Sequence, residues 1–248
     1  MKENLDQYND VYREEAEFFD ENSWFLTRNA THISSEIRKN SFKSLLSLGI
    51  GHHVVSDLLS NELNHTVDRY DILEGSEVII STFKIRDEYI GRLHVHHTYF
   101  EDFEPVAGYD AIEMGFILEH VDDPLAIVTK YKHHLNPGGR MFIAVPNARS
   151  LHRIIGFEAG LLSNLYELGP FDLKQGHKRY FDLESITRLV VESGLVIQRQ
   201  MGLFLKPITT GQMKQLGWGQ NIVDALMKIG EGYPEMANCI MLEASLPE

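Results

Sequence analysis

A short apolar run over residues 44–48 stops at Gly49-Ile50-Gly51, after which apolar residues recur at helical spacing through residue 59. This pattern predicts a strand, a glycine turn and a helix. Glycine lets the backbone turn sharply and approach a ligand, and the first amides of the following helix remain free to donate hydrogen bonds. The unit therefore favours an α/β fold with a ligand at the sheet edge.

The rest of the chain continues this alternation. Asp122 and Asp123 are typical caps of a helix that begins at Pro124 and that we expect to end at residues 136–139. The pattern predicts a doubly wound, mostly parallel sheet with helices on both faces. We expect further strands over 67–73, 92–98, 109–114, 140–145, 195–201 and 238–245, and helices over 76–85, 124–135, 182–193 and 212–229.

Two segments interrupt the regular pattern. Residues 1–40 combine polar helical stretches with aromatic side chains, which predicts a helical lid. Residues 148–181 separate a strand from the next helix without alternation, which predicts an insertion over the sheet. We therefore expect one domain over 41–248, preceded by the lid segment.

Composition limits the partners and the compartment. The net charge of −13 disfavours bulk nucleic acid and anionic membranes, because like charges repel. Cys239 is the single cysteine, so no intrachain disulfide can form. The polar N-terminus is unlike a signal peptide, and no apolar run is long enough to span a bilayer. We expect a cytoplasmic monomer or homodimer.

Glu74 follows the second expected strand, 23 residues after Gly51. In dinucleotide-binding folds an acid about 20 residues beyond the glycine turn accepts hydrogen bonds from ribose hydroxyls. A plain strand–helix turn with a surface glutamate has the same pattern. A nicotinamide oxidoreductase is a further alternative, although the turn has His53 where such folds keep a third glycine.

Several segments occur together in a characteristic order. The sequence resembles the class I S-adenosylmethionine-dependent methyltransferases over about residues 42–200, particularly the branch with ubiquinone-biosynthesis O-methyltransferases and many sugar-modifying enzymes. The resemblance is carried by Gly49-Ile50-Gly51, Glu74, Tyr109-Asp110-Ala111-Ile112, residues 118–124 from Leu118 to Pro124, residues 135–139 from Leu135 to Gly139, and residues 176–181 from Gly176 to Phe181.

The resemblance implies a seven-stranded, Rossmann-like sheet with an antiparallel last strand and a site for S-adenosylmethionine. Ser47 departs from the family, which usually has an acid there to help hold the cofactor's amino group. The implied cofactor contacts are Gly49 and Gly51 at the methionine and ribose, Glu74 with Gly75 at the ribose, Phe100 and Glu101 at the adenine, and Met114 and Gly115 near the sulfur.

Methyl transfer to a hydroxyl or a protonated amine is helped by a general base, and histidine suits that task. His120 follows the fourth expected strand, and His177 lies in the insertion. His120 is also compatible with a capping or packing role at the start of a helix, and His177 with a structural contact that anchors the insertion. Some relatives bind a divalent metal through the corresponding Glu-His pair and an earlier carboxylate, but Phe116 occupies that earlier position, so we expect no metal.

The insertion and the N-terminal segment are the expected acceptor site. We assign Tyr12, Arg153 and Arg179 to acceptor binding, because basic residues concentrate there in an otherwise acidic chain. An ordinary solvated face is the alternative. The expected function is methyl transfer to an oxygen or nitrogen of a small molecule, such as a sugar, nucleotide-sugar or phosphorylated metabolite. The alternative to this expected function is a non-catalytic protein that binds S-adenosylmethionine.

Overall fold

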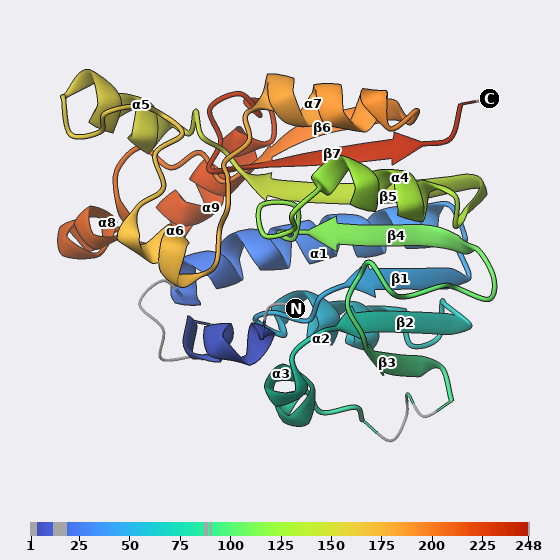
Figure 1. The fold of residues 1–248 in the computed structure, drawn as a ribbon. Coiled ribbons are helices and arrows are strands. Elements are labelled where there is room, and N and C mark those ends of the chain that lie inside the picture. The colour runs from blue at the N-terminus through green and yellow to red at the C-terminus, as the bar shows by residue number, and fades with distance from the viewer. Residues whose placement is uncertain (1–3, 12–18, 87–88, 90, 248) are drawn as a thin grey trace.

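A single sheet of seven strands organises the computed structural model, which describes residues 4–11, 19–86, 89 and 91–247 (Figure 1). The order is β3-β2-β1-β4-β5-β7-β6, and only β7 runs antiparallel to its neighbours among these described strands. The doubly wound sheet with an antiparallel last strand is thus confirmed. The strands are β1 (Ser44–Leu48), β2 (Arg69–Glu74), β3 (Leu93–His97), β4 (Tyr109–Gly115), β5 (Leu135–Pro146), β6 (Val196–Leu203) and β7 (Cys239–Ser245).

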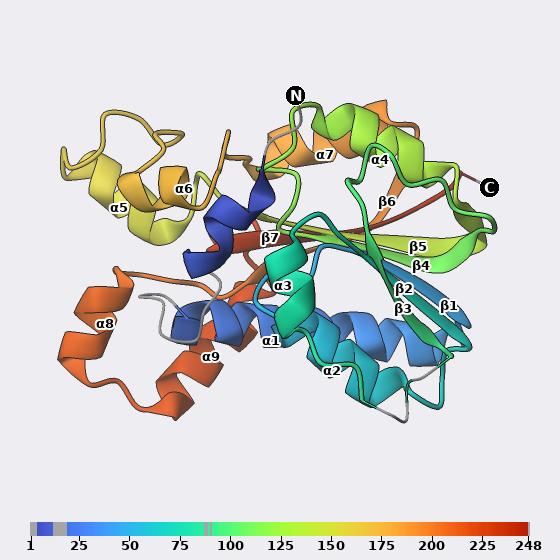
Figure 2. The same cartoon turned by 60° about the horizontal axis from the view of Figure 1, so that its bottom comes forward.

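Helices cover both faces of the sheet (Figure 2). α4 (Pro124–Lys132) and α7 (Leu183–Glu192) pack on one face, where Val128 and Val190 are fully buried. α1 (Phe19–Lys39), α2 (Val54–Leu63) and α9 (Gln220–Gly230) pack on the other. Apolar residues at helical spacing supply both layers, as expected for a sheet buried on its two sides.

Side-chain caps fix where three of these helices begin. Ser76 accepts a hydrogen bond from the Ile79 amide at the start of α3 (Glu77–Thr82). Asp123 caps α4 in the same way, with Pro124 in its first turn. Asp182 caps α7. Such caps satisfy amides that have no partner inside the helix, which explains why the sequence predicted these starts closely.

The shorter helices gather at the carboxyl ends of the parallel strands (Figure 1). The insertion forms α5 (Leu151–Glu158) and α6 (Pro170–Lys174), and α8 (Thr210–Leu216) lies between β6 and α9 in the chain. At the N-terminus, η1 (Leu5–Val11) lies between α3 and α6 (Figure 2). Among the described residues of the expected lid, only η1 has this position, because α1 buries Ala30, Ile33 and Ile37 against the sheet.

Two element boundaries differ from the sequence-based expectation. The segment over residues 136–139 does not end a helix; it bulges within β5, where pairing shifts from Tyr109↔Leu135 to Ala111↔Arg140. The helix expected over 212–229 is two helices, because Gly217 takes a left-handed conformation at φ +61° that ends α8. Within the described residues, no helix has the length and apolar character needed to cross a bilayer.

Candidate active site

A cavity of about 880 Å³ opens at the carboxyl ends of β1, β2 and β4. This is the edge at which open parallel sheets bind ligands, and the volume is typical of a cofactor or small-molecule site. The ends of the strands line one part of the cavity, and η1 and the insertion line another. The cavity thus unites segments from the whole length of the domain.

The glycine turn lines the cavity directly after β1. Gly49 has φ +90° and Gly51 has φ +53°, conformations that glycine adopts without strain. Glu74 locks this turn, since its Oε2 accepts a hydrogen bond from the Ile50 amide at 3.0 Å and its Oε1 accepts one from the Ser76 amide at 2.8 Å. The predicted residues Gly49, Gly51 and Glu74 therefore lie together.

The other predicted cofactor residues divide into two groups. Gly75, Phe100, Glu101 and Gly115 all line the cavity. Met114 does not, because its side chain is fully buried in the apolar layer beneath α4 and α7. Alternate residues of a strand point to opposite faces, so the neighbours of Met114 on β4 face the cavity side and Met114 faces away.

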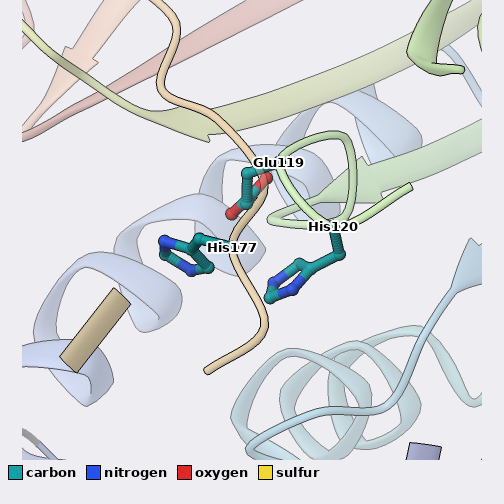
Figure 3. A group of neighbouring side chains, drawn as sticks. All are labelled: Glu119, His120 and His177. Carbon is teal, nitrogen blue, oxygen red and sulfur yellow. The ribbon is translucent and has the colours of Figure 1, made fainter. Parts of the chain in front are cut away.

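His120 and His177 meet in the cavity although 57 positions separate them. Their ring centroids are 4.8 Å apart at an interplanar angle of 78°. Figure 3 shows the Glu119 carboxylate beside the His177 ring as well. The backbone joins the two segments, because the Lys178 amide donates to the Glu119 carbonyl at 2.8 Å.

Burial sets the protonation of this group. Burial, with a smaller contribution from the nearby His177, lowers the pKa of His120 to about 3. It also raises the pKa of the Glu119 carboxyl to about 7, against the opposing effect of His177. His120 is therefore neutral at physiological pH, and Glu119 is present in both its protonated and its ionised form near pH 7.

Asp172 from α6 orients His177. Its Oδ1 lies 3.3 Å from Nδ1 of His177 and also accepts a hydrogen bond from the Tyr180 hydroxyl at 2.8 Å. An imidazole whose Nδ1 faces a carboxylate has its Nε2 free to accept a proton, and the carboxylate stabilises the resulting cation. This pair has the arrangement of a general base and its orienting acid.

Glu119, His120 and His177 also form a candidate metal site. One ligand atom from each lies within 4.8 Å of the other two. Glu119 Oε2 is buried and has no hydrogen-bond partner within the described part of the chain. Phe116, at the position of the relatives' earlier carboxylate, packs on Phe25 instead. Two imidazoles and one carboxylate are a donor set that zinc accepts, whereas magnesium prefers more oxygen ligands.

The three predicted acceptor residues have different positions. Arg153 lines the cavity. Arg179 does not line it, because its guanidinium donates to the backbone carbonyls of Leu118, Val121 and Asp122 and so anchors the loop that carries His120. Tyr12 lies outside the described residues.

Sequence reasoning missed two kinds of lining residue. One is the acid Glu113 on β4; a charged residue between the apolar residues Ile112 and Met114 is the signal that the sequence offers. The other is an ion pair between Lys206 and Glu21, whose Nζ and Oε1 atoms are 2.7 Å apart. The two residues are 185 positions apart, so no local sequence pattern indicates that they pair.

Comparison with known proteins decides the family. Residues 15–200 match the model of a methyltransferase domain. This chain belongs to that methyltransferase family. The match covers the glycine turn, Glu74, the Glu119–His120 loop and His177.

Curated relatives of this methyltransferase match over part of their length. It is 28% identical over 117 residues to a ubiquinone biosynthesis O-methyltransferase of Aeromonas salmonicida (strain A449), covering 46% of this chain and 45% of the relative. It is 50% identical over 44 residues to the enzyme of the same name from Xylella fastidiosa (strain M23), covering 18% of each. These matches thus span less than half the length of either relative.

Solved structures share the fold over nearly the whole chain. The N-methyltransferase NodS of Bradyrhizobium japonicum WM9, in complex with S-adenosylhomocysteine, has a TM-score of 0.58 at 12% identity and covers 98% of this chain and 100% of its own. The plantazolicin methyltransferase BpumL, solved with S-adenosylhomocysteine, has a TM-score of 0.60 at 14% identity, covering 98% and 90%.

The cofactor of this methyltransferase is S-adenosylmethionine. The lining of the cavity fits that molecule: a glycine turn and an acid lie where a nucleoside would enter, and the Phe100 ring lies beside them. The family match removes the nicotinamide oxidoreductase alternative.

Proposed function

We propose that this methyltransferase transfers the methyl group of S-adenosylmethionine to an oxygen or nitrogen of a small acceptor with an anionic group. One observation carries the proposal: the Asp172–His177 pair opens into the same cavity as the glycine turn and Glu74. A proton acceptor and a cofactor turn in one cavity are what methyl transfer to a hydroxyl or amine requires.

When bound, S-adenosylmethionine supplies an electrophilic methyl group on a positively charged sulfur. In the proposed mechanism, Nε2 of His177 would accept the proton that the acceptor oxygen or nitrogen loses, while the sulfur–methyl bond of the donor would break and S-adenosylhomocysteine would leave. Asp172 stabilises the protonated imidazole. Glu74 and the glycine turn would hold the nucleoside part of the cofactor and so would fix its position relative to His177.

His177 suits the role of base better than His120. A group with a pKa of about 3 binds a proton weakly, so His120 stays neutral through the reaction. Its ring packs against His177 at 78°, where it limits the movement of that ring. We therefore assign proton transfer to His177 and positioning to His120.

Arg153 is the proposed contact for the anionic group of the acceptor. Its guanidinium donates to the backbone carbonyls of Leu165 and Glu167 and stacks on Tyr180 at 4.2 Å, so it is held in place by uncharged groups. Lys178 and Lys206 also line the cavity, but each is paired with a carboxylate. No carboxylate within the described ranges forms an ion pair with Arg153, which leaves its charge available.

Product formation tests the function. The protein is incubated with S-adenosylmethionine and matched pairs of small acceptors: phosphorylated or carboxylated hydroxy and amino compounds, including sugar phosphates and nucleotide-sugars, and their neutral counterparts. S-adenosylhomocysteine is then measured by mass spectrometry. We expect turnover with anionic members of the panel. A protein that binds the cofactor and forms no product with any acceptor would instead be the non-catalytic binding protein.

A further inference from the structure

A buried carboxylate lines the cavity from the middle of the sheet. Glu113 on β4 is 3% exposed, and its register partner on β1 is Ser47. Paired residues of parallel strands point to the same face, so both side chains face the layer of α1 and α2. Ser47 has no charge, and its hydroxyl is already hydrogen-bonded to the hydroxyl of Tyr70 at 3.0 Å.

Hydrogen bonds compensate the burial of the Glu113 carboxylate only in part. Its Oε1 accepts one from the Gly115 amide at 2.7 Å, and the hydroxyl of Ser47 is a second neutral donor. No cation within the described residues forms an ion pair with it. Burial raises the pKa of this carboxyl to about 8. A buried acid without a cationic partner costs stability, because its charged form loses its hydration. A cationic ligand in the cavity would remove that cost.

Two further features mark the same place. A Cβ atom added to Gly115 would clash with the Glu113 carboxylate and lie 3.1 Å from Nδ2 of Asn29, so only glycine leaves room there. The Asn29 side chain is 1% exposed, and its Oδ1 and Nδ2 have no hydrogen-bond partner in the described parts of the chain. An acid and an unpartnered amide therefore lie side by side next to a residue that lines the cavity.

S-adenosylmethionine carries two positive charges, the sulfonium and the ammonium of its methionine part. The sulfonium must face the acceptor, whereas the ammonium is remote from the transferred methyl group. We infer that Glu113 binds the ammonium group of the cofactor, with Asn29 next to it, and so supplies from β4 the carboxylate that Ser47 does not supply from β1. The inference rests on the binding of S-adenosylmethionine in this cavity.

Calorimetric titration with two ligands tests the inference. S-adenosylhomocysteine keeps the ammonium, and its deaminated analogue lacks that group alone. The unmodified protein binds S-adenosylhomocysteine at least about 30-fold more tightly, as expected for a desolvated charge pair. In Glu113→Gln the preference falls to about threefold or less, through weaker binding of S-adenosylhomocysteine. An unchanged preference in Glu113→Gln overturns the inference.

Glu243→Gln is the matched control. Glu243 is also buried and lies on β7, but it pairs with His32 and does not line the cavity. This variant keeps the full preference for the ammonium. If Glu243→Gln loses the preference to the same extent as Glu113→Gln, the effect comes from a changed sheet and the inference fails.

A second test uses the unmodified protein, so its result does not depend on whether a variant folds. The groups around Glu113 are the neutral Asn29 and Ser47 and the phenol of Tyr70, whose pKa burial raises far above neutrality. At pH 7, pairing with the ammonium requires Glu113 to lose its proton. Titration in buffers of different ionisation enthalpy therefore shows proton release with S-adenosylhomocysteine and none with the deaminated analogue; equal proton release with both contradicts the inference.

These outcomes separate the inference from the function on which it rests. If neither ligand binds the folded protein, the cofactor assignment itself is wrong. If both bind and the preference does not depend on Glu113, the methyltransferase remains and only the role of Glu113 is lost.

Discussion

The two parts of the cavity are built in different ways. The cofactor part comes from the ends of β1, β2 and β4. Glu74, at the end of β2, accepts a hydrogen bond from the Ile50 amide in the glycine turn that follows β1. The acceptor part comes from the insertion, where α6 places Asp172 against His177 and Arg153 reaches back to the carbonyls of Leu165 and Glu167. The cofactor part therefore belongs to the sheet itself, whereas the acceptor part belongs to an insertion that covers the sheet edge.

This difference indicates that the two parts of the cavity have separate functions. A strand end is fixed by the ladder of the whole sheet, so the cofactor part is preorganised. The cover is joined to the sheet by a few contacts, such as the bond from the Lys178 amide to the Glu119 carbonyl and those of Arg179. Substitutions in the two parts should therefore change different steps, binding of the cofactor on one side and chemistry with acceptor binding on the other.

Replacing the proposed base is expected to have the largest effect. His177→Asn removes the proton acceptor beside Asp172, so kcat falls about 1000-fold, within the range of general-base catalysis. Affinity for S-adenosylhomocysteine stays within twofold, because the cofactor part is untouched. His120→Asn is the control and loses less than about tenfold. Steady-state kinetics with calorimetry measures this, and equal losses in both variants would contradict the assignment of His177.

Removing the acid of the cofactor part comes next. Glu74→Ala loses both the proposed ribose contact and the hydrogen bonds to the Ile50 and Ser76 amides, so S-adenosylhomocysteine binds about 100-fold more weakly. The neighbouring Glu77 is exposed at the start of α3 and does not line the cavity, so Glu77→Ala binds normally. Binding by Glu74→Ala within threefold of the parent would break the proposed link between this acid and the nucleoside.

Stability of the ligand-free protein should fall as the pH rises from about 6.5 to 8. The pKa of Glu113 is raised to about 8 and that of Glu119 to about 7, so over this range the folded state binds more protons than the unfolded state and the free energy of unfolding falls as pH rises. Below about pH 6.5 the lowered pKa values of His120 and His152 act in the opposite direction, because their imidazoles bind protons in the unfolded state that they do not bind in the folded state. The two carboxyls together hold on average about one extra proton over about 1.5 pH units, so at about 1.4 kcal/mol per proton and pH unit a loss of about 2 kcal/mol is expected.

Denaturant unfolding at several pH values measures this slope. Glu113→Gln and Glu119→Gln remove the contributions of the cofactor part and the acceptor part separately, so each flattens the profile. An unfolding free energy that stays constant from pH 6.5 to 8 would contradict the raised pKa values of both carboxyls.

Arg153→Gln should produce a smaller effect, confined to acceptors with an anionic group. Losing one charge-assisted contact raises the KM of such acceptors about tenfold and leaves their neutral counterparts unchanged. Arg149→Gln is the control, since Arg149 lies in the same insertion and does not line the cavity. An unchanged KM in Arg153→Gln would remove the proposed anion contact.

Metal removal is expected to have no effect. The proposed chemistry needs a neutral imidazole at His177 and no Lewis acid, so activity after dialysis against EDTA stays within twofold of the untreated protein. Metal analysis and readdition of zinc or magnesium complete the test. Activity that disappears with EDTA and returns with one cation would assign Glu119, His120 and His177 as its ligands.

The cofactor part of the cavity can be predicted from the sequence better than the acceptor part. The glycine turn, Glu74 and the caps at Asp123 and Asp182 depend on local chemistry within a few residues, so their positions were predicted closely. The bulge within β5 was missed because residues 136–139 have the composition of a helix-ending turn, and only pairing with β4 shows that they belong to a strand.

The acceptor part was less predictable because it depends on contacts across the chain. His120 and His177 were identified by type, but their contact and the orienting Asp172 depend on how α6 folds back. Arg179 was assigned from its charge alone, although neutral carbonyls turn it away from the cavity. Met114 was assigned by its place in a motif, and the alternation of β4 turns its side chain to the other face.

Titration of the unmodified protein with S-adenosylhomocysteine, and separately with NADH, tests the central claim that the carboxyl-edge cavity holds the methyl donor. We predict saturable binding of one S-adenosylhomocysteine per chain and no binding of NADH. A protein that unfolds cooperatively, and is therefore folded, but gives no binding signal with S-adenosylhomocysteine would contradict the account.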